Sequence, residues 1–104
     1  MSEQKPKYHS NCQQRLLRVI VALAGNEFDG LPPGVVAKVS GGTAGSATRD
    51  LANLIQAGMA EEMDNGNYRL GPKLIQIAMA FMRHRDQIAR RVDEMNQRYT
   101  RTPN

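Results

Sequence analysis

The sequence predicts a mainly α-helical domain with one β-hairpin, followed by a long C-terminal helix. Three observations predict it. Apolar residues recur at three- and four-residue spacings over most of the 104-residue chain, as in amphipathic helices. The pair Asn65-Gly66, between two short runs suited to strands, is the preferred centre of a tight hairpin turn. The helical spacing then continues from Pro72 to about Arg98, which predicts a helix of about 27 residues, roughly 40 Å long.

The first helix is predicted to run to about Ala24. Ser10 or Asn11 can cap its first turn, and Gly25 can take the left-handed conformation that ends it. The residues before it, 1–10, are predicted to be a flexible arm. The helix is predicted to have a broad apolar face of Leu16, Leu17, Ile20, Val21, Leu23 and Ala24, and a solvent side marked by Gln13, Gln14, Arg15 and Arg18.

Two shorter helices are predicted next. Pro33 suits the first position of one helix, which carries Val35, Val36 and Val39 and stops at residues 40–42. Thr43 can cap the other helix, and Gly58 ends it. Two short helices joined by a glycine-containing turn form a helix-turn-helix pattern. The core face of the third helix is predicted to be Ala47, Leu51, Leu54 and Ile55.

The hairpin is predicted from strands at 59–63 and 68–70, joined by a type I′ turn in which Asn65 and Gly66 both have positive φ. A hairpin after a helix-turn-helix forms a wing. The predicted fold is therefore a mainly α winged helix-turn-helix over residues 11–80, with residues 81–104 as an extension of the last helix and a short tail. Its predicted core is Leu16, Ile20, Leu23, Val36, Leu51, Leu54, Leu70, Leu74 and Ile77.

The last helix carries a heptad seam. The positions alternate by four and three residues and are apolar except for one arginine: Phe81, Arg85, Ile88, Val92, Met95 and Tyr99. An apolar stripe that continues past the domain predicts a homodimer, with residues 81, 85, 88, 92 and 95 in the interface. The alternative is that Phe81 completes the monomer core and the helix frays beyond about Arg85.

The chain resembles the N-terminal winged helix-turn-helix domain of IclR-type transcriptional regulators over about residues 11–80. Similar stand-alone domains occur among early genes of Mu-like transposable phages. The resemblance implies a DNA-binding domain without the family's effector-binding domain. The chain departs from the usual pattern at the turn, where Ser40 and Gly42 replace apolar residues, and at the small, uncharged segment 43–47. The resemblance rests on residues 15–20, Ala37, Gly41, Thr48-Arg49-Asp50-Leu51, Gly58-Met59-Ala60-Glu61 and, most specifically, the Y-R-L-G-P-K-L run from Tyr68 to Leu74.

A third helix lying in the major groove, about residues 43–57, would present polar side chains to the DNA. Arg49 can bind a guanine edge, and Asn53 can bind adenine or a phosphate. Thr43 and Ser46 suit a phosphate at the helix N-terminus, with Thr48 beside them. The alternative is that Arg49 is solvated or paired with Asp50 or the acids of the wing. The remaining predicted DNA-contacting residues are backbone-binding cations, Arg15, Arg18, Lys38, Arg69 and Lys73, to which Lys5 and Lys7 of the arm are added.

Charge is unevenly distributed. Residues 1–25 carry net +3, residues 26–64 net −4, and residues 65–104 net +5. We therefore expect the basic ends to dominate affinity for double-stranded DNA. The wing tip begins with Asp64 and has no cation, so it is a poor minor-groove probe. The basic run 83–85 with Arg90-Arg91 has three open interpretations: contact with flanking DNA, contact with an acidic partner, or solvation alone.

Two further functions stay open beside a dimeric DNA-binding regulator. One is a protein-interaction winged helix, an anti-repressor or adaptor that binds a polymerase, a repressor or a transposase. The other is an accessory factor that binds DNA weakly without sequence preference. An enzyme is not expected, because the sequence lacks a phosphate-binding loop and a nucleophile elbow.

No cofactor or metal is expected, since His9, Cys12 and His84 are too scattered to form a site. The N-terminus lacks the apolar run of a signal peptide, and no apolar run is long enough to span a membrane. The single cysteine suggests a reducing compartment. We therefore expect a cytoplasmic protein.

Overall fold

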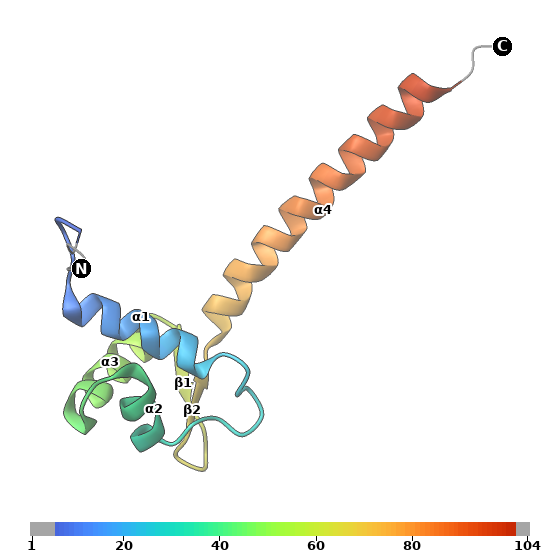
Figure 1. Ribbon diagram of the computed structural model, residues 1–104. Helices are drawn as coiled ribbons and strands as arrows, with labels where there is room; N and C mark the ends of the chain where they lie inside the picture. Colours follow the sequence, from blue (N-terminus) through green and yellow to red (C-terminus); the bar gives the residue numbers. More distant parts are fainter. Residues whose placement is uncertain (1–5, 102–104) are drawn as a thin grey trace. The chain divides into compact units, whose positions relative to one another are not determined.

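The computed structural model describes residues 6–101, so the predicted arm is described only from Pro6, and Lys5 lies outside the described residues. Two compact units are present, residues 1–74 and residues 75–104, and each is described by itself. The fold is mainly helical with one β-hairpin and a long last helix, as predicted (Figure 1). Its elements are α1 (Asn11–Leu23), α2 (Pro33–Ser40), α3 (Ala44–Gln56), β1 (Ala60–Glu62), β2 (Tyr68–Leu70) and α4 (Pro72–Thr100).

Local capping signals set the ends of the first three helices. The Ser10 hydroxyl accepts a hydrogen bond from the Gln13 N–H, so α1 begins at Asn11. Pro33 occupies the first turn of α2, and Gly41 ends that helix with a φ of 78°. Thr43 and Ser46 form a reciprocal capping box at the start of α3. These starts and stops were predicted.

The contacts of Ser40 and Gly42 explain why these residues replace apolar ones in the turn between α2 and α3. Ser40 is fully buried, and its hydroxyl donates to the Ala37 carbonyl at 3.2 Å, so the hydroxyl is satisfied. A Cβ at position 42 would collide with the Ser46 hydroxyl and lie 2.9 Å from Arg15 Cδ. Glycine is therefore required at 42, because the capping box and an arginine side chain fill the space that a larger residue would need.

The hairpin is present, but the predicted turn type is wrong. Asn65 does not have positive φ, and only Gly66 does, at 83°. The Met63 N–H donates to the Asn67 carbonyl at 2.7 Å, and the Gly66 N–H donates to the Met63 carbonyl at 2.9 Å. These bonds define a three-residue loop that ends in a left-handed glycine. The Asn65 side chain accepts the Asn67 N–H at 2.9 Å, which favours this longer loop.

Leu31, outside the two strands of the hairpin, adds a single-residue bridge to the sheet. Leu31 forms an antiparallel bridge with Tyr68 of β2 through two backbone hydrogen bonds of 2.8 and 2.9 Å. Beside them, β1 and β2 pair antiparallel, with Ala60 opposite Leu70. The segment before α2 is therefore fixed to the wing rather than free.

The core lies between α1, α2, α3 and β1. Of the predicted members, Leu23, Val36, Leu51 and Leu54 are buried, whereas Leu16, Ile20, Leu70 and Leu74 are only partly buried. Two assignments are wrong, since Ile55 is 39% exposed and Ile77 is 54% exposed. The buried face of α3 is rotated from Ile55 towards Ser46 and Asp50. The buried core comprises Val19, Leu23, Val36, Ala37, Ala47, Leu51, Leu54 and Ala60.

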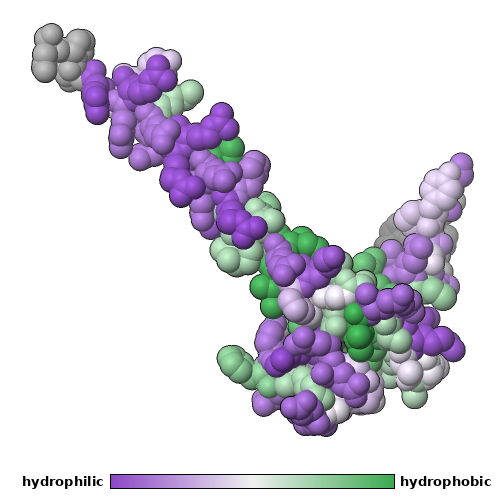
Figure 2. Space-filling view, turned by 180° about the vertical axis from the view of Figure 1, so that it is seen from behind, coloured by the Kyte–Doolittle hydropathy of each residue, from purple (hydrophilic) through white to green (hydrophobic). Residues whose placement is uncertain are grey.

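The last helix, α4, is continuous over 29 residues and has no buried residue within its described length. The structure does not show the alternative considered from the sequence: the helix continues beyond Arg85, and Phe81 does not complete a monomer core, because it is 69% exposed. Figure 2 shows that the surface of α4 is largely hydrophilic away from its first turns, with isolated hydrophobic patches. Within residues 6–101, no helix combines the length and apolar character needed to cross a membrane.

Candidate nucleic-acid interface

The second helix of the helix-turn-helix, α3, presents a solvent-exposed face opposite its buried one. Thr48, Arg49 and Asn53 lie on this exposed face together with Ala52 and Gln56. The Thr48 hydroxyl donates to the Ala44 carbonyl at 2.9 Å, and the Asn53 amide donates to the Arg49 carbonyl at 2.8 Å. Both are bonds within the helix, at the surface, so either side chain can exchange its bond for one to a ligand.

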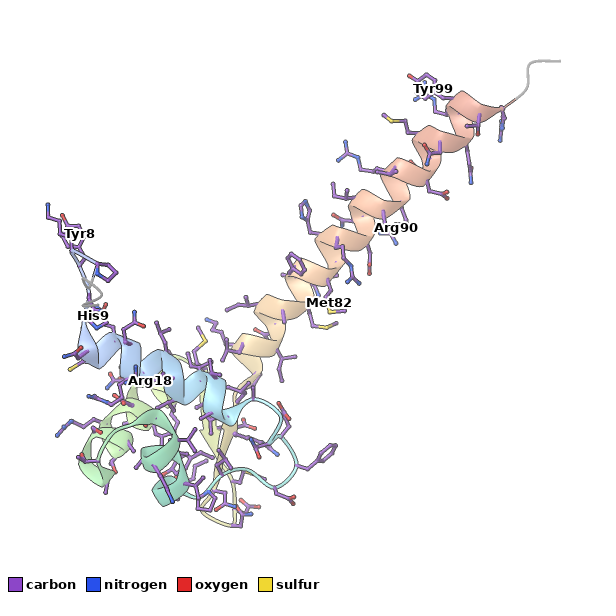
Figure 3. The ribbon with its side chains drawn as sticks, viewed as in Figure 1. Tyr8, His9, Arg18, Met82, Arg90 and Tyr99 are labelled. Atoms are coloured by element: carbon purple, nitrogen blue, oxygen red, sulfur yellow. The ribbon has the colours of Figure 1, made fainter. Side chains whose placement is uncertain are left out.

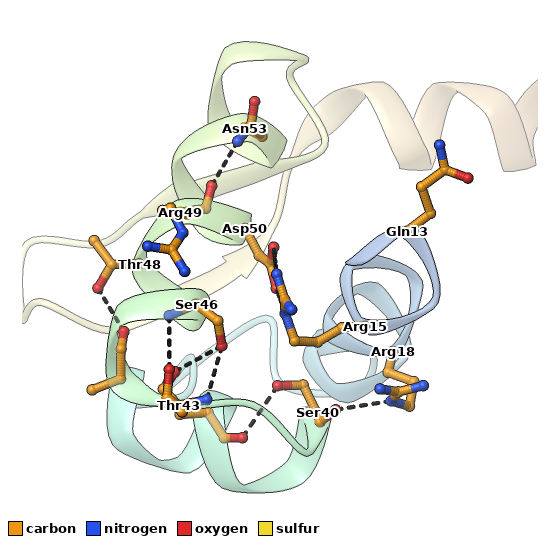
Figure 4. A network of polar contacts seen from close by, with 12 residues as sticks. Gln13, Arg15, Arg18, Ser40, Thr43, Ser46, Thr48, Arg49, Asp50 and Asn53 are labelled. Atoms are coloured by element: carbon orange, nitrogen blue, oxygen red, sulfur yellow. Dashed lines mark hydrogen bonds and ion pairs between the residues drawn. The ribbon is translucent and has the colours of Figure 1, made fainter. Parts of the chain in front are cut away.

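Beneath this face lies a bidentate ion pair between α1 and α3 (Figure 4). Arg15 Nε and Nη2 donate to the two carboxylate oxygens of Asp50 at 2.7 and 3.0 Å. The two side chains are 19% and 7% exposed, respectively. The hydrogen bond to Asp50 raises the pKa of Arg15 above its ordinary value. Asp50 is therefore committed to Arg15, although it is the sequence neighbour of Arg49.

The wing contains a second ion pair. Arg69 Nε bonds to Glu61 Oε1 across the hairpin, and Arg69 Nη1 donates to the Glu27 carbonyl at 3.3 Å. Arg69 was predicted to bind a phosphate, but here it neutralises a wing acid and braces the loop after α1. Of the acids considered as partners for Arg49, Asp50 and Glu61 are thus occupied, and no acid of the wing forms an ion pair with Arg49 among the described residues.

Arg49 itself is exposed, and its guanidinium makes no ion pair or hydrogen bond within the described part of the chain. Its planar group keeps its hydrogen-bond donors available for a planar acceptor such as the O6/N7 edge of guanine. The predicted alternative of a fixed ion pair with Asp50 or a wing acid is not what the structure shows. Arg49 is solvated and unpaired.

Three other predicted contacts serve the fold. Arg18 Nε donates to the Ser40 carbonyl at 2.8 Å and so caps the end of α2. Ser46 is buried, and its hydroxyl bonds the Thr43 N–H and carbonyl within the capping box. Thr43 in turn accepts the Ser46 N–H at 3.1 Å. Because these groups already satisfy one another, we remove Ser46 and Arg18 from the candidate interface. Lys38 and Lys73 are exposed and stay in it.

Arg49 and Asn53 border a groove that the sequence analysis missed. It has a volume of about 540 Å³ and lies between the first half of α1 and the middle of α3. Leu17 lines it and is half exposed, whereas the sequence placed that residue on the apolar face. No local signal predicts the groove, because it depends on how the two helices cross. Its lining residues are Cys12, Gln13, Arg15, Leu16, Leu17, Arg49, Asp50 and Asn53.

The opposite end of this unit is acidic and carries an exposed aromatic side chain. The loop after α1 is tied to the hairpin, since the Asn67 amide donates to the Asp29 carbonyl at 3.0 Å. Phe28, at the tip of this loop, is 94% exposed. Glu27, Asp29 and Asp64 surround the junction of loop and wing in sequence, and all three are exposed. This end repels phosphate rather than binding it.

The α4 seam is exposed throughout. Its apolar members are between 43% and 76% exposed, and Arg85 lies among them with its guanidinium 3.4 Å from Asp86. Among the described residues, no three His, Cys, Asp or Glu side chains come close enough together to hold a metal ion. The seam residues are Phe81, Arg85, Ile88, Val92, Met95 and Tyr99.

Neither known protein-family models, nor curated proteins, nor solved structures give a match to this chain. The similarity to IclR-type domains therefore rests on the sequence motifs alone, chiefly the run from Tyr68 to Leu74. The function proposed next depends on the exposed face of α3 and on the seam of α4.

Proposed function

We propose that this protein is a DNA-binding transcriptional regulator of IclR-like type that acts in the cytoplasm. The observation that carries the proposal is the unpaired Arg49 on the exposed face of α3. Asp50 and Glu61 are held by Arg15 and Arg69, and Arg49 makes no ion pair among the described residues, so its guanidinium is available. A second helix of a helix-turn-helix with a free arginine at its centre fits insertion into the major groove.

The α4 seam supports a homodimer. A single winged unit with one free cation on its reading helix would bind weakly, because phosphate contacts supply most of the affinity. Pairing two copies through α4 doubles those contacts and imposes a two-fold site. The exposed apolar seam is the surface that such pairing would cover.

DNA binding is tested by titrating labelled random duplex DNA at several salt concentrations. With about three phosphate contacts from each subunit of a dimer, log K is expected to fall with log salt at a slope near −5. Binding that does not depend on salt, or no binding to any duplex at about 50 mM salt, would contradict the proposal.

Arg49→Ala is expected to weaken specific binding by about 1–3 kcal/mol and to relax specificity at one base pair. Selection of bound sequences from a random pool, for the wild type and the variant, measures both effects. Gln14→Ala, an exposed position of α1 outside the candidate interface, is the control and should leave the selected sequence unchanged. An unaltered sequence preference in Arg49→Ala would show that α3 does not read DNA through this residue.

A protein-interaction winged helix is the second candidate, and one observation favours it. Phe28 is almost fully exposed on a loop that hydrogen bonds hold against the acidic wing. Such a side chain suits an apolar socket with a basic rim on a partner in the transcription or transposition machinery. A wild-type protein that binds no duplex at low salt would favour this function.

A further inference from the structure

Most of the net positive charge of the described residues lies in residues 75–101. The described residues 6–74 hold seven basic and six acidic residues, a net charge of +1. Residues 75–101 hold six arginines and three acids, a net charge of +3. Within the winged unit, Arg15, Arg18 and Arg69 are also engaged in bonds that stabilise the fold. The larger net positive charge therefore lies in residues 75–101.

Three of the α4 arginines form a row. At 100° per residue, Arg83, Arg90 and Arg91 fall within an arc of about 100°. Arg90 lies about 180° from Tyr99 of the seam. Figure 3 shows the two side chains projecting to opposite sides of α4. We call Arg83, Arg90 and Arg91 the arginine row. Pairing through the seam would leave Arg83 and Arg90 exposed, with Arg91 at the edge of the interface.

The other arginines of this helix have a local role. Arg85 lies in the seam and contacts Asp86. Arg98 stacks over the Tyr99 ring at 5.8 Å, and it lies in the last turn, where the helix dipole favours a cation. The row has neither role, because its members lie in the middle of the helix and make no ion pair among the described residues.

Three acids are present on the same helix. Asp86 and Asp93 lie on the side next to the row, whereas Glu94 lies within its arc. They lower the positive potential but do not cancel it, since α4 carries five arginines and three carboxylates. A dimer would present two such rows on one paired helix stem.

We propose that the arginine row of α4 is a second DNA-contact surface, which binds backbone phosphates outside the base pairs read by α3. This inference rests on the proposed function, because it requires that the protein binds DNA. The end of the winged unit formed by the loop after α1 and the wing tip exposes Glu27, Asp29 and Asp64 and disfavours phosphate, so phosphate contacts beyond α3 need another surface. The row supplies those contacts instead, and duplex DNA is the polyanion already bound by the same molecule.

The test uses the full chain and a random-sequence duplex of about 40 base pairs, at salt concentrations from about 50 to 300 mM. In the variant Arg83→Gln, Arg90→Gln, Arg91→Gln, the slope of log K against log salt concentration is expected to become less negative by at least about two. Affinity at about 100 mM salt should fall at least tenfold. Glutamine keeps the helix propensity close to that of arginine, so circular dichroism should be unchanged.

Two controls isolate the charge of the row. The triple substitution of the same residues by lysine keeps the charge and should bind within about threefold of the wild type. Asp86→Asn with Asp93→Asn removes flanking acids and should steepen the slope. Sedimentation of the glutamine variant should match the wild type, because the seam is untouched.

The outcomes separate this inference from the proposed function. If the wild type binds DNA and the glutamine variant binds with the same affinity and slope, the row is not a DNA surface and the inference is wrong. A loss of affinity shared by the lysine variant would also overturn it, since charge would not be the cause. If the wild type binds no duplex, the proposed function itself fails.

Discussion

The double variant Val92→Asp, Met95→Asp is expected to turn the dimer into a monomer and to weaken DNA binding at least tenfold. Both side chains lie in the α4 seam and are half exposed in the single chain. An interface between two copies would bury them, and a carboxylate there would have to be desolvated without a partner. Losing one subunit halves the phosphate contacts available to each complex.

Sedimentation and DNA titration measure the two effects in one preparation. The control Gln87→Asp, Gln97→Asp adds the same two charges to the same helix away from the seam. It should still sediment as a dimer, so a comparison of the two variants separates loss of pairing from loss of charge. Both changes lie in residues 75–104, so the winged unit should melt unchanged in each variant.

A wild-type chain that sediments as a monomer at tens of micromolar would contradict the dimeric regulator. So would a double variant that binds DNA as tightly as the wild type.

Arg85 allows a separate test of the dimer, because this arginine occupies a seam position between Phe81 and Ile88. Arg85→Leu is accordingly expected to tighten the dimer, at the expense of a fixed register.

The ends of the helices were predictable because their signals are local. A serine, a threonine and a proline mark the starts of α1, α3 and α2, and a left-handed glycine marks the end of α2. Each signal acts within three or four residues of the backbone group that it satisfies. The hairpin was predicted for the same reason, from the short polar run around Asn65-Gly66.

The orientation of the helices was not predictable, because it depends on a contact between residues 35 positions apart. Arg15 was assigned to the solvent side of α1, yet it reaches Asp50 on α3. With this pair in place, Val19 of α1 is fully buried and Ile55 of α3 is partly exposed. Apolar periodicity does not show such a contact between helices.

The same difference between local signals and distant contacts separates the residues of the candidate interface. Arg49 was found from its place on a helical wheel, because exposure on a single helix follows from the spacing of its apolar residues. Arg18 and Arg69 were assigned to DNA because a sequence does not show which backbone carbonyl or carboxylate lies across the fold. The bridge between Leu31 and Tyr68 escaped detection for that reason as well.

Gly71→Ala is expected to destabilise the winged unit by about 2–3 kcal/mol, which lowers Tm by roughly 10–15 °C. Gly71 is buried where the chain leaves the wing. A Cβ there would collide with the Gly58 carbonyl oxygen and lie 2.9 Å from the Ala60 nitrogen. Both are backbone atoms, so no side-chain rotation can relieve the contact. The Gly71 N–H also donates to the Met59 carbonyl at 2.9 Å, which holds the two segments together.

Gly34→Ala is the matched control for this substitution. Position 34 lies in the first turn of α2, where an added Cβ meets nothing within 4 Å. Alanine there should stabilise the helix by about 0.5–1 kcal/mol, because it restricts the unfolded chain and favours helical backbone. The Tm measured by circular dichroism should therefore fall for Gly71→Ala and rise for Gly34→Ala. A Gly71→Ala protein that melts at or above the wild-type temperature would mean that the strands after α3 do not pass this close to the start of α4.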